Sequence, residues 1–306
     1  FRRVLFRSVI TSHNSDARLP PASLTKLMTA YVTTRELKSG RISADDQVVV
    51  SENAWRTGGS RMFLEPGSSA SVHDLLSGVI IDSGNDASVA LAEHIAGSEG
   101  GFVGMMNSTA STLGLINTHF MNSTGLPDPE HYSSARDMAT LALKVINEGT
   151  TYYPLYAKKT FTWNGIQQSN RNALLWRNSI YDGLKTGHTE AAGYCLVASA
   201  QRDGQRLISA VLGASSTRKR AEETEKLMGY GFRFYDTQTY KKGGEVLAQA
   251  ALWKGKQPSI SVGLLDDMTL TLPKNASRKI EMRLAFDGPI EAPITAGTVI
   301  GRLDLF

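Results

Sequence analysis

The stretch Pro20-Pro21-Ala22-Ser23-Leu24-Thr25-Lys26-Leu27-Met28-Thr29-Ala30 decides how this chain of 306 residues is interpreted. Two prolines lead into a predicted helix that carries Ser23 in its first turn, and Lys26 follows three residues later. Helical positions i and i+3 share a face, so the hydroxyl and the amine lie side by side. A neutral lysine in that position can take the serine proton and turn the hydroxyl into a nucleophile.

The same pair also has a plainer interpretation. A serine three residues before a lysine arises by chance about once in a chain of this length, so Ser23 could cap the helix while Lys26 is solvated. Free lysine titrates near ~10.4, and a base at neutral pH needs a pKa lower by roughly 3 units. Burial and a second nearby cation are the usual means of lowering it. Other segments must therefore decide between the two interpretations.

Two further polar segments follow in the sequence. Ser83-Gly84-Asn85 lies in a break between predicted helices over residues 72–81 and 87–95, and its side chains could serve only to cap the second helix. Lys185-Thr186-Gly187 stands at the start of a predicted edge strand. An ordered triple in plausible secondary-structure context is far more specific than any one of its parts. The three motifs together therefore favour a catalytic role for Ser23 and Lys26 over a purely structural one.

Composition excludes several classes of protein. The net charge is +4, and no basic cluster is interleaved with aromatic residues, so we expect no nucleic-acid partner. Cys195 is the single cysteine, which excludes an intramolecular disulfide and a thiol metal site. No apolar run approaches the ~18 residues of a membrane span. Besides His188 in the third polar segment, the histidines show no metal-ligand spacing, and we expect neither metal nor other cofactor; they are His13, His73, His94, His119 and His131.

The length of the chain and the positions of its glycine and proline residues predict the domain organisation. A chain of 306 residues is expected to form about two domains. Residues 1–8 are basic and apolar but too short for an export signal, so they are interpreted as a remnant of truncation or cloning. Residues 9–238 are predicted to form the catalytic domain. Residues 239–306 hold short β-prone runs separated by glycine and proline, which predicts a β-sandwich-like domain.

Local patterns predict the remaining elements. Ser134 and Asp137 are spaced like a capping box at a helix start, with Asp in place of Glu. Alternating runs over residues 194–200 and 207–213 predict a hairpin whose connection is longer than two residues. The other expected elements are a strand tail over 9–14, a helix from Ser23 that Gly40 ends, short strands around 48–50 and 62–64, and helices over 103–118, 134–146 and 218–234.

The three motifs together resemble the signature of penicillin-binding proteins and serine β-lactamases, with Ser-Gly-Asn as the second motif. More closely, Pro21–Thr29, Ser83–Ala87 and Asp182–Thr189 are similar to the low-molecular-weight D-alanyl-D-alanine carboxypeptidases, and the similarity covers nearly all of the chain after residue 13. It implies an α+β fold. A serine β-lactamase/transpeptidase-like domain, with an antiparallel sheet flanked by helices, is followed by a small all-β domain.

The resemblance implies roles for the motif residues. Ser23 attacks the carbonyl of a terminal peptide bond and releases D-alanine, while Lys26 takes the serine proton. Ser83 relays a proton towards the leaving amine, and Lys185 supplies a positive charge that also helps to keep Lys26 neutral. Asn85 hydrogen-bonds the peptide amide of the substrate.

It also implies how the substrate is held. Backbone N–H groups of Ser23 and His188 are expected to form the oxyanion hole, and Gly187 lets the substrate backbone approach and pair with its strand. Thr186 and Arg220 receive the terminal carboxylate. The fallback for Arg220 is Arg218, and either could be a solvated helix residue.

Two further residues, Arg171 and Thr124, have weaker evidence for a role in the site. Arg171 is expected at most to support a loop. Thr124 stands where some relatives carry a histidine before a Gly-Leu pair, so a role shared with them at that position is in doubt.

The implied partners are peptidoglycan stem peptides ending in D-Ala-D-Ala, and β-lactam antibiotics as covalent inhibitors. The implied location is periplasmic or extracytoplasmic, with membrane association only through a C-terminal amphipathic helix that this chain lacks. A serine β-lactamase is the nearest rival, but no Glu-x-x-x-Asn loop lies between Ser134 and Lys185 to supply a deacylating base. A catalytically idle peptidoglycan-binding module would have lost one of the motifs, and all three are present.

Overall fold

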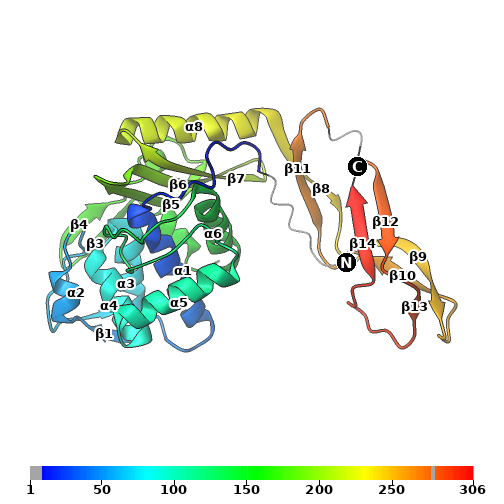
Figure 1. Ribbon diagram of the computed structural model, residues 1–306, viewed down its shortest axis with the longest axis horizontal. Coiled ribbons are helices and arrows are strands. Elements are labelled where there is room, and N and C mark those ends of the chain that lie inside the picture. The colour runs from blue at the N-terminus through cyan, green and yellow to red at the C-terminus, as the bar shows by residue number, and fades with distance from the viewer. Residues whose placement is uncertain (1–8, 150, 277–279, 306) are drawn as a thin grey trace. The chain divides into compact units, whose positions relative to one another are not determined.

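The computed structural model describes residues 9–149, 151–276 and 280–305, and it divides into two compact units. One unit spans Ser12–Gly229, and the other contains Tyr230–Phe306. Each is described by itself. Figure 1 labels most of the helices and strands of the two units.

The regular elements of the first unit alternate between helices and short strands. In chain order they are η1 (Ala22–Thr25), α1 (Lys26–Lys38), β1 (Gln47–Val49), α2 (Glu52–Arg56), β2 (Ser69–Ser71), α3 (Val72–Ser77), η2 (Gly78–Asp82), α4 (Asn85–Ala96), α5 (Glu99–Thr112), α6 (Ala135–Glu148), η3 (Tyr153–Ala157), β3 (Thr160–Trp163), β4 (Ile166–Ser169), α7 (Leu174–Arg177), β5 (Tyr181–Thr189), β6 (Gly193–Arg202), β7 (Gln205–Ala214) and α8 (Thr217–Phe234).

Helix α1 lies in the middle of the hydrophobic core. Residues from Lys26 to Thr33 are all buried, so this helix has no solvent face over its first two turns. Leu27 and Met28 pack in one core cluster with Leu75 and Leu91 from the neighbouring helices. Because a helix that is buried on every side needs apolar residues all round, its amphipathic pattern is weak in the sequence.

A three-stranded antiparallel sheet in the order β5-β6-β7 forms the second layer. Helix α8 lies along one face of this sheet, and α1 and α6 lie on the other (Figure 1). The buried face of α8 repeats every three to four residues through Arg220, Thr224 and Met228, as expected for a helix with one face on a sheet. Among the described strands, β5 pairs only with β6, so its outer edge has no partner strand beside η1.

The hairpin between β6 and β7 is tighter than the sequence predicted. The strands extend to Arg202 and Gln205 and leave a two-residue turn, Asp203-Gly204. Both turn residues have positive φ, 50° for Asp203 and 77° for Gly204, as a type I′ turn requires. The predicted longer connection is therefore wrong, because polar residues on the two strand ends continue the pairing.

Two predicted strands do not form. Residues 62–64 belong to no strand, because the N–H groups of Met62 and Leu64 donate to the buried Asp86 carboxylate at 2.8 and 3.1 Å instead of to a neighbouring strand. Residues 9–14 are also without regular structure. The strand around 48–50 does form, as β1 paired with β2.

The helices differ from expectation mainly at their ends. The predicted helix over 72–81 divides into α3 and η2, a turn of π-helix, and α5 begins and ends earlier than predicted. Ser134 caps α6 by accepting the N–H of Asp137 at 3.1 Å. The Asp137 carboxylate does not return the bond to Ser134. It accepts instead from Asn117 N–H and the Thr118 hydroxyl, so the capping box is only half formed.

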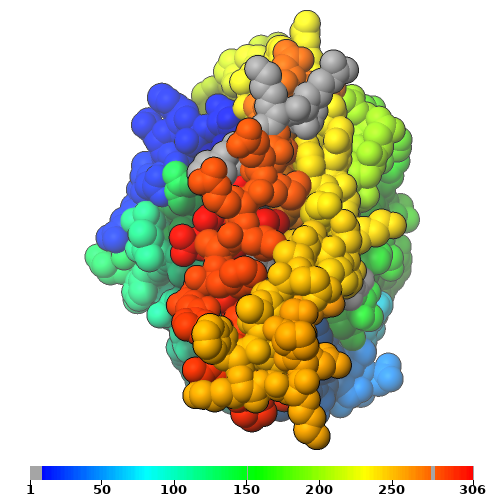
Figure 2. Space-filling view, turned by 90° about the vertical axis from the view of Figure 1, so that its right-hand side faces the viewer, coloured from blue at the N-terminus to red at the C-terminus, as the bar shows by residue number. Residues whose placement is uncertain are grey.

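After α8 ends, the regular elements in the described residues of the second unit are all strands. They are β8 (Tyr235–Lys241), β9 (Val246–Trp253), β10 (Ser259–Gly263), β11 (Met268–Pro273), β12 (Met282–Phe286), β13 (Ile290–Glu291) and β14 (Gly301–Leu305). They form three small sheets, β10-β9-β13, β11-β8 and β12-β14. In Figure 2 the residues of this unit, coloured from yellow-orange to red, form one continuous surface. Its small core is built around Ala250, Val262 and Ile290.

The prediction of an α+β domain followed by a small all-β domain is confirmed. No helix in the described part of the chain combines the length and the apolar character needed to cross a membrane.

Candidate active site

Ser23 lies in a turn of 3₁₀-helix, η1, that leads directly into α1. The preceding residue, Ala22, has φ of 48°, a left-handed conformation that costs an alanine energy and that packing must enforce. Gly125 packs against this turn so closely that a Cβ there would lie 1.9 Å from the Ala22 carbonyl oxygen. The serine is thus held at a bend that neighbouring backbone fixes.

Strand β5 packs against the same turn on its other side. A Cβ on Gly187 would lie 2.9 Å from the Pro21 carbonyl oxygen and 3.1 Å from the Ser23 nitrogen. We expected Gly187 to make room for substrate, but the backbone that approaches it here is that of the chain itself. Glycine at this position places the third motif directly beside the first.

Lys26 is buried, with 1% of its surface exposed, and its amine has three hydrogen-bond acceptors. The Nζ atom lies 3.2 Å from Ser23 Oγ, 2.6 Å from Asn85 Oδ1 and 2.6 Å from the carbonyl oxygen of Thr124. None of these acceptors is a carboxylate, so no ion pair stabilises the charged amine at hydrogen-bond distance. This arrangement is suited to a lysine that gives up its proton.

The surroundings lower the pKa of Lys26 well below the ordinary value for lysine. Burial is the largest cause, followed by the positive charges of Lys185 and Arg171, while Asp86 acts in the opposite direction. These are the two means, burial and a second cation, that the sequence analysis required.

Asn85 bridges the first two motifs. Its Oδ1 accepts from Lys26, and its Nδ2 donates to the Gly58 carbonyl at 2.6 Å, so both ends of the amide already have partners in the chain. We expected the amide to face the substrate, and the substrate would have to compete with these contacts. Gly84, not a side chain, occupies the N-cap of α4, so capping does not account for Ser83 or Asn85.

Ser83 lies at the junction of η2 and α4 and is buried. Its φ of 63° is left-handed, an uncommon conformation for serine that turns the chain sharply between the two helices. Such backbone strain concentrates where geometry is fixed for function.

Lys185 is the second buried lysine, with 3% of its surface exposed. Its amine donates to the Thr186 carbonyl at 3.2 Å. Burial, followed by the charges of Arg171 and Arg220, lowers the pKa of Lys185 to about 7. The positive charge of Lys185 is in turn one of the causes that lower the pKa of Lys26.

The residues expected at the carboxylate end of the substrate lie along β5 and α8. Thr186 is buried on β5, whereas His188 is exposed and its ring stacks on Tyr194 with centroids 4.1 Å apart. Arg220 is buried and donates to the carbonyl oxygens of Gly187 and Cys195 at 3.4 and 3.2 Å. The Arg220 guanidinium therefore holds the backbone of the third motif in place through these two hydrogen bonds.

Arg171 and Arg218, the two weaker candidates for a role in the site, have different surroundings. Arg171 donates to the Ser60 hydroxyl at 2.5 Å, and its charge acts on Lys26 and Lys185. Arg218 is exposed on α8 and pairs with Glu222, 3.6 Å away, as a solvated helix residue does.

The Thr124 carbonyl, an acceptor for Lys26, could not be predicted from the sequence. The Asn122 side chain aims it by accepting from the Thr124 and Gly125 N–H groups at 3.2 and 2.7 Å. A backbone carbonyl leaves no mark in the sequence, since any residue supplies one. The only available signal was the Asn-x-x-Gly spacing of a turn.

A second missed contact lies below η1. The Thr25 hydroxyl lies 2.8 Å from His131 Nε2, and His131 Nδ1 accepts the Met121 N–H at 3.3 Å, so the neutral ring donates through Nε2. Burial lowers the pKa of His131 to about 4 and keeps the ring neutral.

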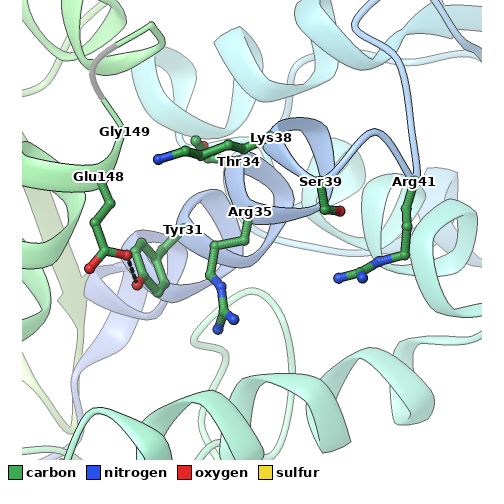
Figure 3. Close-up of a pocket in the computed structure, with 8 residues that line it drawn as sticks. All are labelled: Tyr31, Thr34, Arg35, Lys38, Ser39, Arg41, Glu148 and Gly149. Atoms are coloured by element: carbon green, nitrogen blue, oxygen red, sulfur yellow. Dashed lines mark hydrogen bonds between the residues drawn. The ribbon is translucent and has the colours of Figure 1, made fainter. Parts of the chain in front are cut away.

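A pocket of about 380 Å³ lies away from this site, towards the other end of α1 (Figure 3). Two of its three cations, Arg35 and Lys38, are in the last turn of α1, where positive charge complements the helix dipole, and the third, Arg41, pairs with Glu36. Its acid, Glu148, accepts from the Tyr31 hydroxyl and from Lys144. These contacts account for the pocket as part of the packing of α1.

Taken together, the fold and the site are those of a serine hydrolase in which a buried lysine amine lies 3.2 Å from the serine hydroxyl. The family model for D-alanyl-D-alanine carboxypeptidase matches residues 7–216, and the model for the C-terminal domain of penicillin-binding protein 5 matches residues 234–306.

Known proteins agree over almost the whole chain. D-alanyl-D-alanine carboxypeptidase DacA of Escherichia coli strain K12 is 42% identical over 304 residues, which cover 97% of this chain and 75% of DacA. The crystal structure of penicillin-binding protein 5 from Haemophilus influenzae superposes with a TM-score of 0.92 at 42% identity, covering 98% of this chain and 89% of that one.

A more distant structure, penicillin-binding protein D2 of Listeria monocytogenes in its ampicillin-bound form, has a TM-score of 0.66 at 33% identity and covers 72% of this chain and 91% of that one. The chain belongs to the S11 family of serine peptidases, and it is a D-alanyl-D-alanine carboxypeptidase.

Proposed function

We propose that Ser23 is the nucleophile of this carboxypeptidase and that neutral Lys26 is the base that activates it. The observation that carries the proposal is the 3.2 Å contact between a buried Lys26 amine and Ser23 Oγ, in surroundings that disfavour the charged amine. Ser23 attacks the carbonyl carbon of the terminal peptide bond as its proton passes to Lys26. The products are an acyl-enzyme and free D-alanine.

The leaving amine needs a proton, and Ser83 and Lys185 are the groups proposed to deliver it. The strained turn at Ser83 and the lowered pKa of Lys185 support this assignment. Water then attacks the acyl-enzyme in the second half of the reaction, with the same groups acting in reverse order.

The substrate is proposed to lie along the open edge of β5, where an extended peptide can add as a further strand. Backbone N–H groups of Ser23 and His188 then face the developing oxyanion. Thr186 receives the terminal carboxylate, with Arg220 as its cation. The Arg220 bonds to Gly187 and Cys195 carbonyls support an indirect contribution as well, since they hold β5 in place.

The proposed substrates are peptidoglycan stem peptides that end in D-Ala-D-Ala, and the proposed inhibitors are β-lactams, which acylate the same serine. The ampicillin-bound form of the Listeria relative supports the second point. Because such stems lie outside the cytoplasm, the enzyme is proposed to act in the periplasm or its equivalent.

Mass spectrometry of the intact protein after brief exposure to penicillin tests the assignment. We expect one adduct, mapped to Ser23 and absent from Ser23→Ala. Ser216→Ala serves as the matched control, since Ser216 lies just before α8 and caps it by accepting the Lys219 N–H at 3.0 Å. The control should acylate like the wild type.

The lifetime of the adduct separates the two kinds of enzyme that share this chemistry. Persistence over hours is expected for the carboxypeptidase, whereas rapid loss with consumption of the drug would identify a β-lactamase. A folded wild-type protein that forms no adduct would refute Ser23 as the nucleophile.

A further inference from the structure

Asp82, the residue before Ser83, is the most anomalous buried group of the first unit. It is the last residue of η2, and 1% of its surface is exposed. Among the residues that the structure describes, neither of its carboxylate oxygens has a hydrogen-bond partner. An unpaired buried carboxylate is costly, and it calls for an explanation.

The neighbouring acid shows how different Asp82 is. Asp86 is equally buried, but its oxygens accept from the N–H groups of Met62, Leu64 and Ala87. Asp86 therefore stabilises the backbone of its loop. Asp82 stabilises no backbone group in this way, and packing alone would favour an apolar residue at its position.

The charged groups that act on Asp82 all belong to the site. Arg171 and Lys185 favour its ionised form, and Asp86 opposes it, but burial has the largest effect and raises the pKa of Asp82 to about 7. Arg171 is exposed and permanently charged, so Asp82 cannot change its state. Lys185 is buried, and its charge depends on its surroundings.

The influence is mutual. Burial and the positive charges of Arg171 and Arg220 favour neutral Lys185, and Asp82 acts against them. We propose that Asp82 is a positioning residue whose unpartnered carboxylate keeps the positive charge on Lys185 while the site is active. Because no hydrogen bond neutralises the buried Asp82 carboxylate, its negative charge is available to act on Lys185. The inference rests on the role proposed for Lys185.

The test is the pH dependence of kcat/KM for a tripeptide that ends in D-Ala-D-Ala, measured for wild type and Asp82→Asn. Removing the carboxylate lowers the pKa of Lys185, so the alkaline limb of the profile should shift to lower pH by about one unit. A nearby charge typically shifts a pKa by about one to three units, and we expect the smaller effect. The acid limb, which reports Lys26, should stay in place. A role in packing alone would lower the whole profile without moving either limb.

Asp137→Asn is the matched control. Asp137 is also buried and carries a carboxylate, but it binds Asn117 and Thr118 at the start of α6. This variant is expected to lose thermal stability and to keep both limbs in place. Asp82→Asn should melt at a higher temperature than wild type at pH 8, because it no longer buries an unpaired charge. An unmoved alkaline limb in folded Asp82→Asn, or an equal shift in the control, overturns the proposal.

Two further measurements keep the outcome decisive. Asp82→Ser removes the same charge with a smaller side chain and should shift the same limb if Asp82→Asn does not fold. If neither folds, carbon-13 NMR of wild-type protein and of Lys185→Ala, both labelled at the aspartate carboxyls, must show one carboxyl whose pKa rises when Lys185 is removed, and its absence refutes the inference. Activity retained by Lys185→Ala would instead refute the proposed role of Lys185, a separate failure.

Discussion

At the residue scale, the surroundings of Lys26 are what support its proposed role as the base. Its partners are a hydroxyl, an amide oxygen and a backbone carbonyl, which hold the amine in place without fixing its charge. The nearest cations then favour the neutral form. The hydrogen bonds set the position of the Lys26 amine, whereas burial and the neighbouring positive charges set its pKa.

Lys26→Arg tests this division. Arginine keeps its charge at all working pH values, so it can hold similar hydrogen bonds but cannot accept the serine proton. We expect the rate of acylation by penicillin to fall by roughly 10²–10⁴-fold, the usual contribution of a general base. Stopped-flow fluorescence would measure it, with Lys144→Arg on α6 as the control. Acylation within a few-fold of wild type would rule out Lys26 as the base.

His131 gives a prediction about stability and pH. Its folded pKa of about 4 lies below the ordinary value of 6.5, so the unfolded chain binds a proton first as the pH falls. The stability that neutral His131 provides is therefore complete above pH 6.5 and is lost between about 6.5 and 4, by about 3 kcal/mol at most.

His131→Gln should remove that part of the pH dependence, because glutamine can donate to Thr25 and accept from Met121 without titrating. Urea unfolding of both proteins at pH 7 and pH 4 would measure it. Equal losses on acidification in the two proteins would contradict the prediction.

At the element scale, the site depends on how closely three backbones approach. The η1 turn lies between β5 and the loop around Gly125, and glycine provides the closest contact on each side. Such contacts are short, so a single added methyl group disturbs the position of Ser23.

Gly125→Ala should therefore be severely destabilising. The new Cβ would meet the Ala22 carbonyl, and the φ of 85° at this position is strained for any other residue. We expect a loss of roughly 2 kcal/mol or more together with slower acylation. Gly104→Ala in α5 is the control, because its Cβ meets nothing within 4 Å. Thermal melts of the pair would show a difference, and similar melting temperatures would disprove the tight packing of η1.

The elements also show what the sequence could predict. Helix α6 and the β6-β7 hairpin were predictable because a cap, an Asp-Gly pair and alternating residues are local signals. The strand expected around Met62 was wrong because Asp86, distant in sequence, takes the backbone N–H groups that a strand would need. The three motifs were visible, but the contacts of Asn85 with Lys26 and Gly58 were not, since they depend on tertiary packing.

At the scale of the whole molecule, the described catalytic candidates all lie in the unit Ser12–Gly229. We propose that residues 9–238 form an independent catalytic domain and that 239–306 form a separate one. A chain that ends at residue 238 keeps α8 but separates the start of β8 (Tyr235–Lys241) from its partner strand β11. It should still be acylated by penicillin within about three-fold of the full chain, because no proposed catalytic group is removed. Acylation kinetics would measure it. A folded, truncated chain that is not acylated would refute the proposed boundary.

The three acceptors of Lys26 come from segments far apart in the sequence, at Ser23, Asn85 and Thr124. The base is thus assembled only when the start of α1, the start of α4 and the loop after α5 have all docked together. A molecule in which any one of these has detached would expose the amine to water, return it to its charged form and leave the serine unreactive. A fluorescent penicillin would therefore label only intact molecules, and the labelled fraction during refolding would count the native population directly.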